Sequence, residues 1–202
     1  MGAGILPVTL HNGKIYFLFG KENKYADTPG WSDFGGGTET KENFLNTAIR
    51  EAGEEITGFL GTDKDIKKML TKYGTYNIEN SSNGHGAYRM HIFPMEYNEF
   101  LPLFYNNNQK FLQKRLDPNV IKNSTIFEKD EIKWICIDDL KKMMPMFRHY
   151  FTVIVDKILN NRVEIERFAK SALIKGNGRS SGSGSSSRSR SSSQLRHTRK
   201  SR

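Results

Sequence analysis

Apolar side chains recur between residues 41 and 56 at the spacing of one face of an α-helix. This stretch contains no proline, and polar residues fill the positions between the apolar ones. We therefore predict a helix over residues 41–56 with one face buried. The residues of that face are Phe44, Leu45, Ala48, Ile49, Ala52 and Ile56.

Shorter apolar or alternating runs predict β-strands on both sides of this helix. Residues 5–10 and 14–20 flank His11-Asn12-Gly13, a turn signal, and predict a β-hairpin. The other predicted strands cover residues 31–34, 73–80 and 87–97 and a run that ends at residue 135, with a turn-rich loop over 81–86.

The second half of the chain carries further helical patterns. A short helix is predicted over residues 63–72, and another begins at Asp138. Residues 100–116 are aromatic but interrupted by three asparagines at 106–108, which predicts a loop followed by a helix. A long amphipathic helix is predicted over residues 147–174. Strands and helices thus mix along the chain, which indicates an α/β protein.

Composition divides the chain of 202 residues into two parts. Residues 1–175 suffice for one domain with a substantial core. Residues 176–202 are rich in serine, glycine and arginine, and we predict a disordered basic tail. This tail accounts for most of the net charge of +9. It is interpreted either as a solubilising appendage or as an arm that attracts RNA phosphates.

Location is also predicted from composition. No apolar run is long enough to cross a membrane, and residues 1–10 lack the basic start and cleavage site of a secretory signal. The single cysteine, Cys136, has no partner for an internal disulfide, which fits a reducing compartment. We therefore predict an intracellular, cytoplasmic protein without membrane contact.

Three acids of the predicted helix point to a metal site. Glu51, Glu54 and Glu55 are spaced so that they are neighbours on the helix surface, where their charges repel. A divalent cation is the simplest compensation, and oxygen ligands suit Mg²⁺ or Mn²⁺. The glycines at 35–37 predict a turn whose backbone carbonyls lie close to that metal. Metal-assisted phosphoryl chemistry follows from this arrangement.

The same stretch resembles the Nudix box of the Nudix hydrolase superfamily. Gly36, then Glu42 after five residues, then Arg50-Glu51 after seven, then Glu54-Glu55 after two, match all of its charged positions. The sequence departs from the box at the helix exit, where Thr57 replaces glycine and Gly58 follows one residue late. It also departs at Ala52 and at Phe34. Overall the chain is similar to Nudix proteins of large DNA viruses, which would place it in host cytoplasm or in a virion.

The resemblance implies a fold and a set of site residues. The implied fold is an α/β/α sandwich with a mixed sheet. The implied metal ligands are the Gly35 carbonyl, Glu51, Glu54 and Glu55. The implied catalytic residues are Glu51, Glu54 and Glu128, with Glu51 or Glu128 as the base and Glu131 as the second choice to Glu128. Phosphate contact is implied for Lys21 and Arg89, and structural support for Gly36, Glu42 and Arg50.

The implied activity is hydrolysis of a diphosphate linkage in a nucleoside diphosphate joined to another group. A free nucleotide, a dinucleoside polyphosphate and a capped RNA all fit as substrates. The alternative is a Nudix-fold RNA-binding module without turnover.

Overall fold

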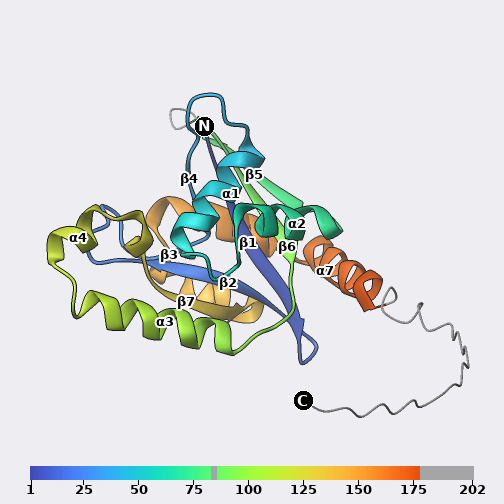
Figure 1. Ribbon diagram of the computed structural model, residues 1–202. Helices are drawn as coiled ribbons and strands as arrows, with labels where there is room; N and C mark the ends of the chain where they lie inside the picture. The colour runs from blue at the N-terminus through green and yellow to red at the C-terminus, as the bar shows by residue number, and fades with distance from the viewer. Residues whose placement is uncertain (83–85, 178–202) are drawn as a thin grey trace, which may run out of the picture.

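The computed structural model describes residues 1–82 and 86–177, with side chains described for residues 1–81 and 86–172. Seven strands form one mixed sheet (Figure 1). Residues 83–85, inside the predicted 81–86 loop, and 178–202, nearly all of the predicted tail, lie outside the described residues. The strands are β1 (Gly2–His11), β2 (Lys14–Glu22), β3 (Trp31–Ser32), β4 (Phe34–Gly37), β5 (Tyr76–Ser82), β6 (Gly86–Pro94) and β7 (Lys129–Cys136).

Strand β1 organises the sheet. It pairs in parallel with β6 along one edge, and its other edge is shared between two antiparallel partners. Residues 2–5 pair with β4, and residues 8–11 pair with β2, which confirms the predicted hairpin. Strand β2 then leaves β1 to pair with β3 and β7. The sheet therefore divides between β4 and β2, and polar side chains gather at this division.

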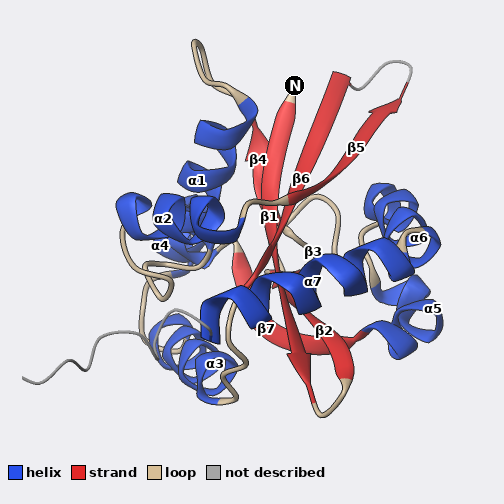
Figure 2. Cartoon of the chain, turned by 90° about the vertical axis from the view of Figure 1, so that its right-hand side faces the viewer, coloured by secondary structure: helices blue, strands red, loops and turns tan. Residues whose placement is uncertain are grey.

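Helices cover both faces of the sheet, so the predicted α/β/α sandwich with a mixed sheet is confirmed (Figure 2). One apolar core lies between the sheet and the first three helices, and a second core lies between the sheet and the last helices. None of the helices in the described ranges is long and apolar enough to span a bilayer. The helices are α1 (Phe44–Glu55), α2 (Asp63–Tyr73), α3 (Phe100–Gln113), α4 (Pro118–Asn123), α5 (Leu140–Met143), α6 (Thr152–Asn160) and α7 (Arg162–Asn177).

The segment before α1 differs from the prediction in two ways. The helix begins at Phe44 rather than at residue 41, because the Asn43 side chain accepts a hydrogen bond from the Asn46 N–H and caps the helix. The glycines at 35–37, predicted as a turn, belong to strand β4 and pair with β1. The glycines allow β4 to approach β1 closely, since a Cβ on Gly35 would meet backbone atoms of β1.

The close approach of β4 to β1 gives a testable prediction about stability. A Cβ on Gly35 would contact the Gly4 Cα and lie 2.6 Å from the Ala3 carbonyl oxygen, both backbone atoms that cannot move aside. We expect Gly35→Ala to lower the free energy of unfolding by about 1–3 kcal/mol, measured by urea denaturation. Gly37→Ala is the control, because no atom lies within 4 Å of the added Cβ, and equal losses would contradict the prediction.

The aromatic stretch at residues 100–116 was predicted wrongly as a loop and a helix. It forms one helix, α3, that continues through the three asparagines. The Asn106 side chain accepts a hydrogen bond from the Ile132 N–H at 2.8 Å and donates one to the Ile132 carbonyl at 3.1 Å. Asn106 thereby satisfies backbone groups of β7 that face no neighbouring strand, which compensates for the poor helix propensity of asparagine.

The long helix predicted over residues 147–174 is also wrong, because it is divided at Asn161. Helix α6 ends at Asn160, and the Asn161 side chain donates to the Lys157 carbonyl at 2.8 Å. Tyr76 of β5 donates its hydroxyl hydrogen to Asn161 Oδ1, which fixes the break against the sheet. Both helices still bury apolar residues in the same core. The helical spacing of apolar residues therefore continues past Asn161, although the helix itself is interrupted there.

Candidate active site

Arg50 joins the start of α1 to the loop that precedes it. Its Nε and Nη2 donate to the two carboxylate oxygens of Glu42 at 3.0 and 3.1 Å, and Nη2 also donates to the Gly37 carbonyl at 2.9 Å. Glu42 in turn accepts hydrogen bonds from the Thr47 hydroxyl and the Glu39 N–H. The guanidinium holds the pKa of Glu42 down to about 2. This bidentate pair fixes the loop against the helix.

The remaining nitrogen of the same guanidinium brings two predicted site acids together. Arg50 Nη1 lies 3.0 Å from Glu51 Oε1 and 3.6 Å from Glu54 Oε2. Burial raises the pKa of Glu51, and Arg50 opposes that rise. Burial also raises the pKa of Glu128, with a contribution from the charge of Glu54. Glu51, Glu54 and Glu128 therefore act on one another electrostatically at the partly exposed edge of α1.

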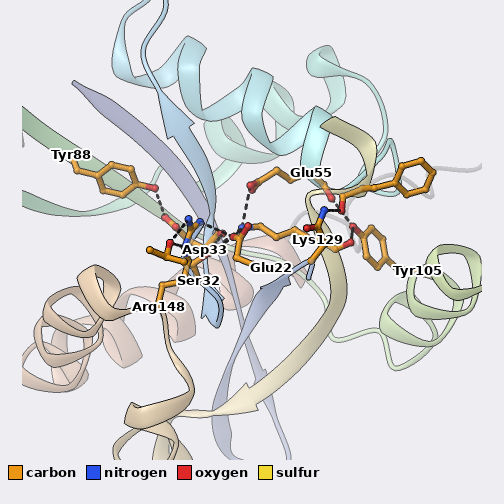
Figure 3. Close-up of polar contacts among 11 residues, drawn as sticks. Glu22, Ser32, Asp33, Glu55, Tyr88, Tyr105, Lys129 and Arg148 are labelled. Atoms are coloured by element: carbon orange, nitrogen blue, oxygen red, sulfur yellow. Dashed lines mark hydrogen bonds and ion pairs between the residues drawn. The ribbon is translucent and has the colours of Figure 1, made fainter. Parts of the chain in front are cut away.

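Glu55, the third acid of the α1 cluster, is buried and pairs with a lysine. Its side chain is 2% exposed, and Oε1 lies 3.1 Å from Nζ of Lys129, which is fully buried (Figure 3). Lys129 Nζ also contacts Glu22 and donates to the Ser32 hydroxyl. Burial alone would lower the pKa of Lys129, but Glu55 and Glu22 outweigh it and keep the ammonium charged. Burial raises the pKa of Glu55 well above its ordinary value, and the Lys129 ammonium opposes that rise.

The buried cluster continues through the division of the sheet. Arg148 Nη1 lies 2.7 Å from Glu22 Oε1, and Tyr88 donates its hydroxyl hydrogen to Asp33 Oδ2 at 2.8 Å. Burial raises the pKa of Asp33 to about 6. Two cations, Lys129 and Arg148, therefore face two acids, Glu22 and Glu55, while Asp33 is easily protonated. Buried charges need partners of opposite sign, because their removal from water costs free energy that only such pairing offsets.

The other predicted site residues lie around these acids. Lys21 is exposed on β2, opposite Glu131 of β7. Arg89 of β6 pairs with Glu79 at 2.7 Å and stacks over the Phe44 ring at the start of α1. A Cβ on Gly36 would lie 2.5 Å from Glu51 Oε1, so this glycine leaves the space that the Glu51 carboxylate fills.

The donor chemistry of the site fits a hard divalent cation. Glu51 and Glu54 offer carboxylate oxygens beside one another, and Glu55 Oε2 is buried without a hydrogen-bond partner in the described part of the chain. Within residues 1–82 and 86–177, however, no group of three acids, histidines or cysteines is arranged to hold one metal ion. Arg50 and Lys129 also place positive charge beside these acids.

Apart from Glu55, the residues of the buried cluster were not predicted; they are Glu22, Ser32, Asp33, Tyr88, Lys129 and Arg148. Glu22, Lys129 and Arg148 are distant in the sequence, and no spacing links them to α1. Tyr105 of α3 was not predicted either; its hydroxyl donates to the Glu55 carbonyl at 2.7 Å and fixes the end of α1. An isolated lysine beside Glu128 carries no signal of complete burial, because lysines are ordinarily exposed.

His91 of β6 gives a prediction about pH. Its side chain is 5% exposed, Nε2 has no hydrogen-bond partner among the described residues, and burial lowers its pKa to about 4. The unfolded chain therefore binds the proton first, and stability is lost as pH falls from about 6.5 to about 4. We expect the wild-type free energy of unfolding to fall by up to about 3 kcal/mol more than that of His91→Leu over this interval.

Urea denaturation at pH values between about 4 and 7.5 measures this difference. The exposed-histidine variant His149→Leu is the control and should follow the wild type. Parallel curves for the wild type and His91→Leu would contradict the prediction.

No protein-family model matches the chain. Over 58 residues it is 40% identical to an uncharacterized protein of Acanthamoeba polyphaga mimivirus, an alignment that covers 27% of this chain. The chain spans about a fifth of the length of that curated relative, with 19% covered.

The chain is also similar to several solved structures. They include a C. elegans Ap4A hydrolase binary complex, at 14% identity and a TM-score of 0.47, covering 81% of this chain and 97% of that one. A Nudix hydrolase from M. smegmatis is 13% identical with a TM-score of 0.47, covering 81% and 86%. A MutT protein from Methanosarcina mazei is 14% identical with a TM-score of 0.43, covering 80% and 93%. Similarities at this level do not assign an activity to the chain.

Proposed function

We propose that this protein is a metal-dependent hydrolase of the Nudix type that cleaves a diphosphate linkage in a nucleoside diphosphate joined to another group. The observation that carries the proposal is the cluster of carboxylates at the edge of α1. Glu51 and Glu54 share one nitrogen of Arg50, the charge of Glu128 contributes to the raised pKa of Glu51, and the charge of Glu54 contributes to the raised pKa of Glu128. Arg50 is itself fixed by Glu42, so the acids occupy defined positions.

The residues that would hold Mg²⁺ or Mn²⁺ are Glu51, Glu54, the free oxygen of Glu55 and the Gly35 carbonyl. When bound, such an ion polarises a phosphoryl oxygen and lowers the pKa of a water molecule. The bidentate hydrogen bond from Arg50 to Glu42 would hold the helix that carries these ligands in place.

A carboxylate of the site would take the proton of the attacking water. Glu51 and Glu128 both qualify, because burial raises the pKa of each toward the range in which a general base works. The water oxygen forms a bond to phosphorus, the bond between that phosphorus and the bridging oxygen breaks, and the leaving group keeps the bridging oxygen. The exposed ammonium of Lys21 and the guanidinium of Arg89 are proposed to contact substrate phosphates.

A substrate panel tests the proposal. The full chain is incubated with Mg²⁺ or Mn²⁺ and with free nucleotides, sugar nucleotides, dinucleoside polyphosphates and capped RNA, and products are separated by anion exchange. Release of a nucleoside monophosphate or diphosphate that depends on the metal is expected for at least one class. Intact substrate in every class would contradict hydrolysis.

One observation favours a second candidate, an RNA-binding module without turnover. Arg50 and Lys129 already neutralise the acids of α1, and no three-ligand metal group exists among the described residues. In this case the basic tail is proposed to supply phosphate contacts. The module would bind capped RNA in the panel, more weakly at higher salt, and would leave it intact.

A further inference from the structure

Exposed apolar side chains concentrate on one part of the surface. Within the described residues, seven of the twelve large apolar side chains that are exposed fall between residues 100 and 126. Concentrations of this kind mark interaction sites more often than isolated exposed side chains do. The seven exposed apolar side chains are Phe100, Leu103, Phe104, Phe111, Leu116, Val120 and Ile126.

Three phenylalanines form a stripe along the outer face of α3. At about 100° per residue, Phe100, Phe104 and Phe111 fall within an arc of about 40°, and the stripe is about 16 Å long. Their side chains are 53%, 59% and 54% exposed. Phe100 and Phe104 are stacked with their ring centroids 6.0 Å apart. The stripe therefore offers flat aromatic surfaces to solvent.

The opposite face of α3 is committed to the fold. Leu101, Tyr105 and Gln109 are buried, and Asn106 is bonded to β7. Figure 1 shows α3 along the lower edge of the molecule, where this buried face rests on β7. The phenylalanines are thus outside the core and are available for another molecule.

Positive charge surrounds the stripe. Lys110 in the last turn of α3 is exposed, as are Lys114 and Arg115 directly after the helix and Lys122 of α4. The Arg115 guanidinium lies 3.8 Å from the centre of the Phe111 ring. From residue 100 to residue 124 the chain carries four basic residues and one acidic residue, Asp117.

We propose that this face of α3 binds single-stranded RNA. Unpaired bases stack on aromatic rings and on guanidinium planes, while lysines and arginines contact the phosphates between them. A purely apolar partner would gain nothing from the cations, whereas a polyanion complements them. Asn107 and Asn108 are exposed beside the phenylalanines and offer amide groups to ribose hydroxyls and base edges.

The helix that carries the stripe is anchored to the helix that carries the candidate acids. Tyr105, on the buried face of α3, donates to the carbonyls of Glu55 and Lys129, at 2.7 and 3.2 Å. The phenylalanine stripe is on the opposite face of α3, directed away from α1, so a bound strand would not need to contact the acids of α1. Binding there is independent of the proposed hydrolysis, because the strand itself needs no diphosphate linkage.

The experiment measures affinity by fluorescence anisotropy. The probe is a labelled RNA strand about twelve nucleotides long without a 5′ phosphate, and EDTA excludes divalent metal, so no turnover is required. We expect the double variant Phe104→Ala, Phe111→Ala to bind about tenfold to hundredfold more weakly than the full wild-type chain. The tail is intact in both proteins, so the difference reports the α3 face.

Further variants separate the outcomes. Phe104→Trp with Phe111→Trp should retain wild-type affinity, because indole rings also stack on bases. Lys114→Gln with Arg115→Gln should lower the slope of log Kd against log salt by about one or more. The control Val163→Ala removes an exposed apolar side chain from α7 and should not change binding.

Three results would overturn the proposal. One is wild-type RNA affinity in the double alanine variant. Another is equal affinity for DNA of the same sequence, which would remove the assignment to RNA. The last is a wild-type dimer in sedimentation equilibrium that becomes a monomer in the double alanine variant, which would assign the face to a second copy of the chain.

Discussion

Glu54→Gln should lower the kcat of diphosphate hydrolysis on the order of 10²–10⁴-fold, the range expected for loss of a catalytic carboxylate. The amide keeps the size of the side chain but removes its negative charge. Glu54 lies 3.6 Å from Arg50 Nη1 and is partly exposed, so the fold should be preserved. Turnover of the best substrate in the panel is measured together with Mn²⁺ affinity by titration calorimetry, and both should decrease.

Glu164→Gln is the matched control, because Glu164 is exposed on α7 at the other face of the sheet. It should hydrolyse and bind Mn²⁺ as the wild type does. If Glu54→Gln kept wild-type turnover and Mn²⁺ affinity, Glu54 would be removed from the metal site. If the wild type bound Mn²⁺ but hydrolysed no substrate, the result would support the RNA-binding module without turnover.

Lys129→Met should lower the free energy of unfolding by about 3–5 kcal/mol, which is a large share of the stability of an ordinary domain. The substitution leaves Glu55 buried without a cation, and Glu55 Oε2 already has no hydrogen-bond partner among the described residues. Glu22 keeps Arg148, so the loss falls mainly on Glu55. Urea denaturation measures it.

Two further variants test that assignment. Lys129→Met combined with Glu55→Gln should recover part of the loss, because a neutral amide replaces the unpaired carboxylate. Lys170→Met breaks an exposed pair with Glu166 on α7 and should cost less than about 1 kcal/mol. Equal losses for Lys129→Met and Lys170→Met would show that the buried cluster contributes no special stability.

Local features of the fold were predictable where neighbours in sequence decide them. The hairpin around Asn12-Gly13 depends on the turn itself, since both residues have positive φ. Helix α2 begins at a capping box formed by Thr62 and Asp65, and its predicted limits of 63–72 differ by one residue from the structure. The spacing of apolar residues did not predict that α3 is one helix or that a helix ends before Asn161. Contacts with β7 and β5 decide whether those helices continue or end.

The sequence by itself determined the α/β class, the amphipathic helix α1 and the order of acids along it, because these depend on spacing within one segment. Only the tertiary structure decided how the acids divide, with Glu51 and Glu54 around Arg50 and Glu55 around Lys129. Lys129 comes from β7, and the division of the sheet between β4 and β2 brings it beside α1. Burial and ion pairing between distant segments follow from chain topology, and no local pattern of residues specifies them.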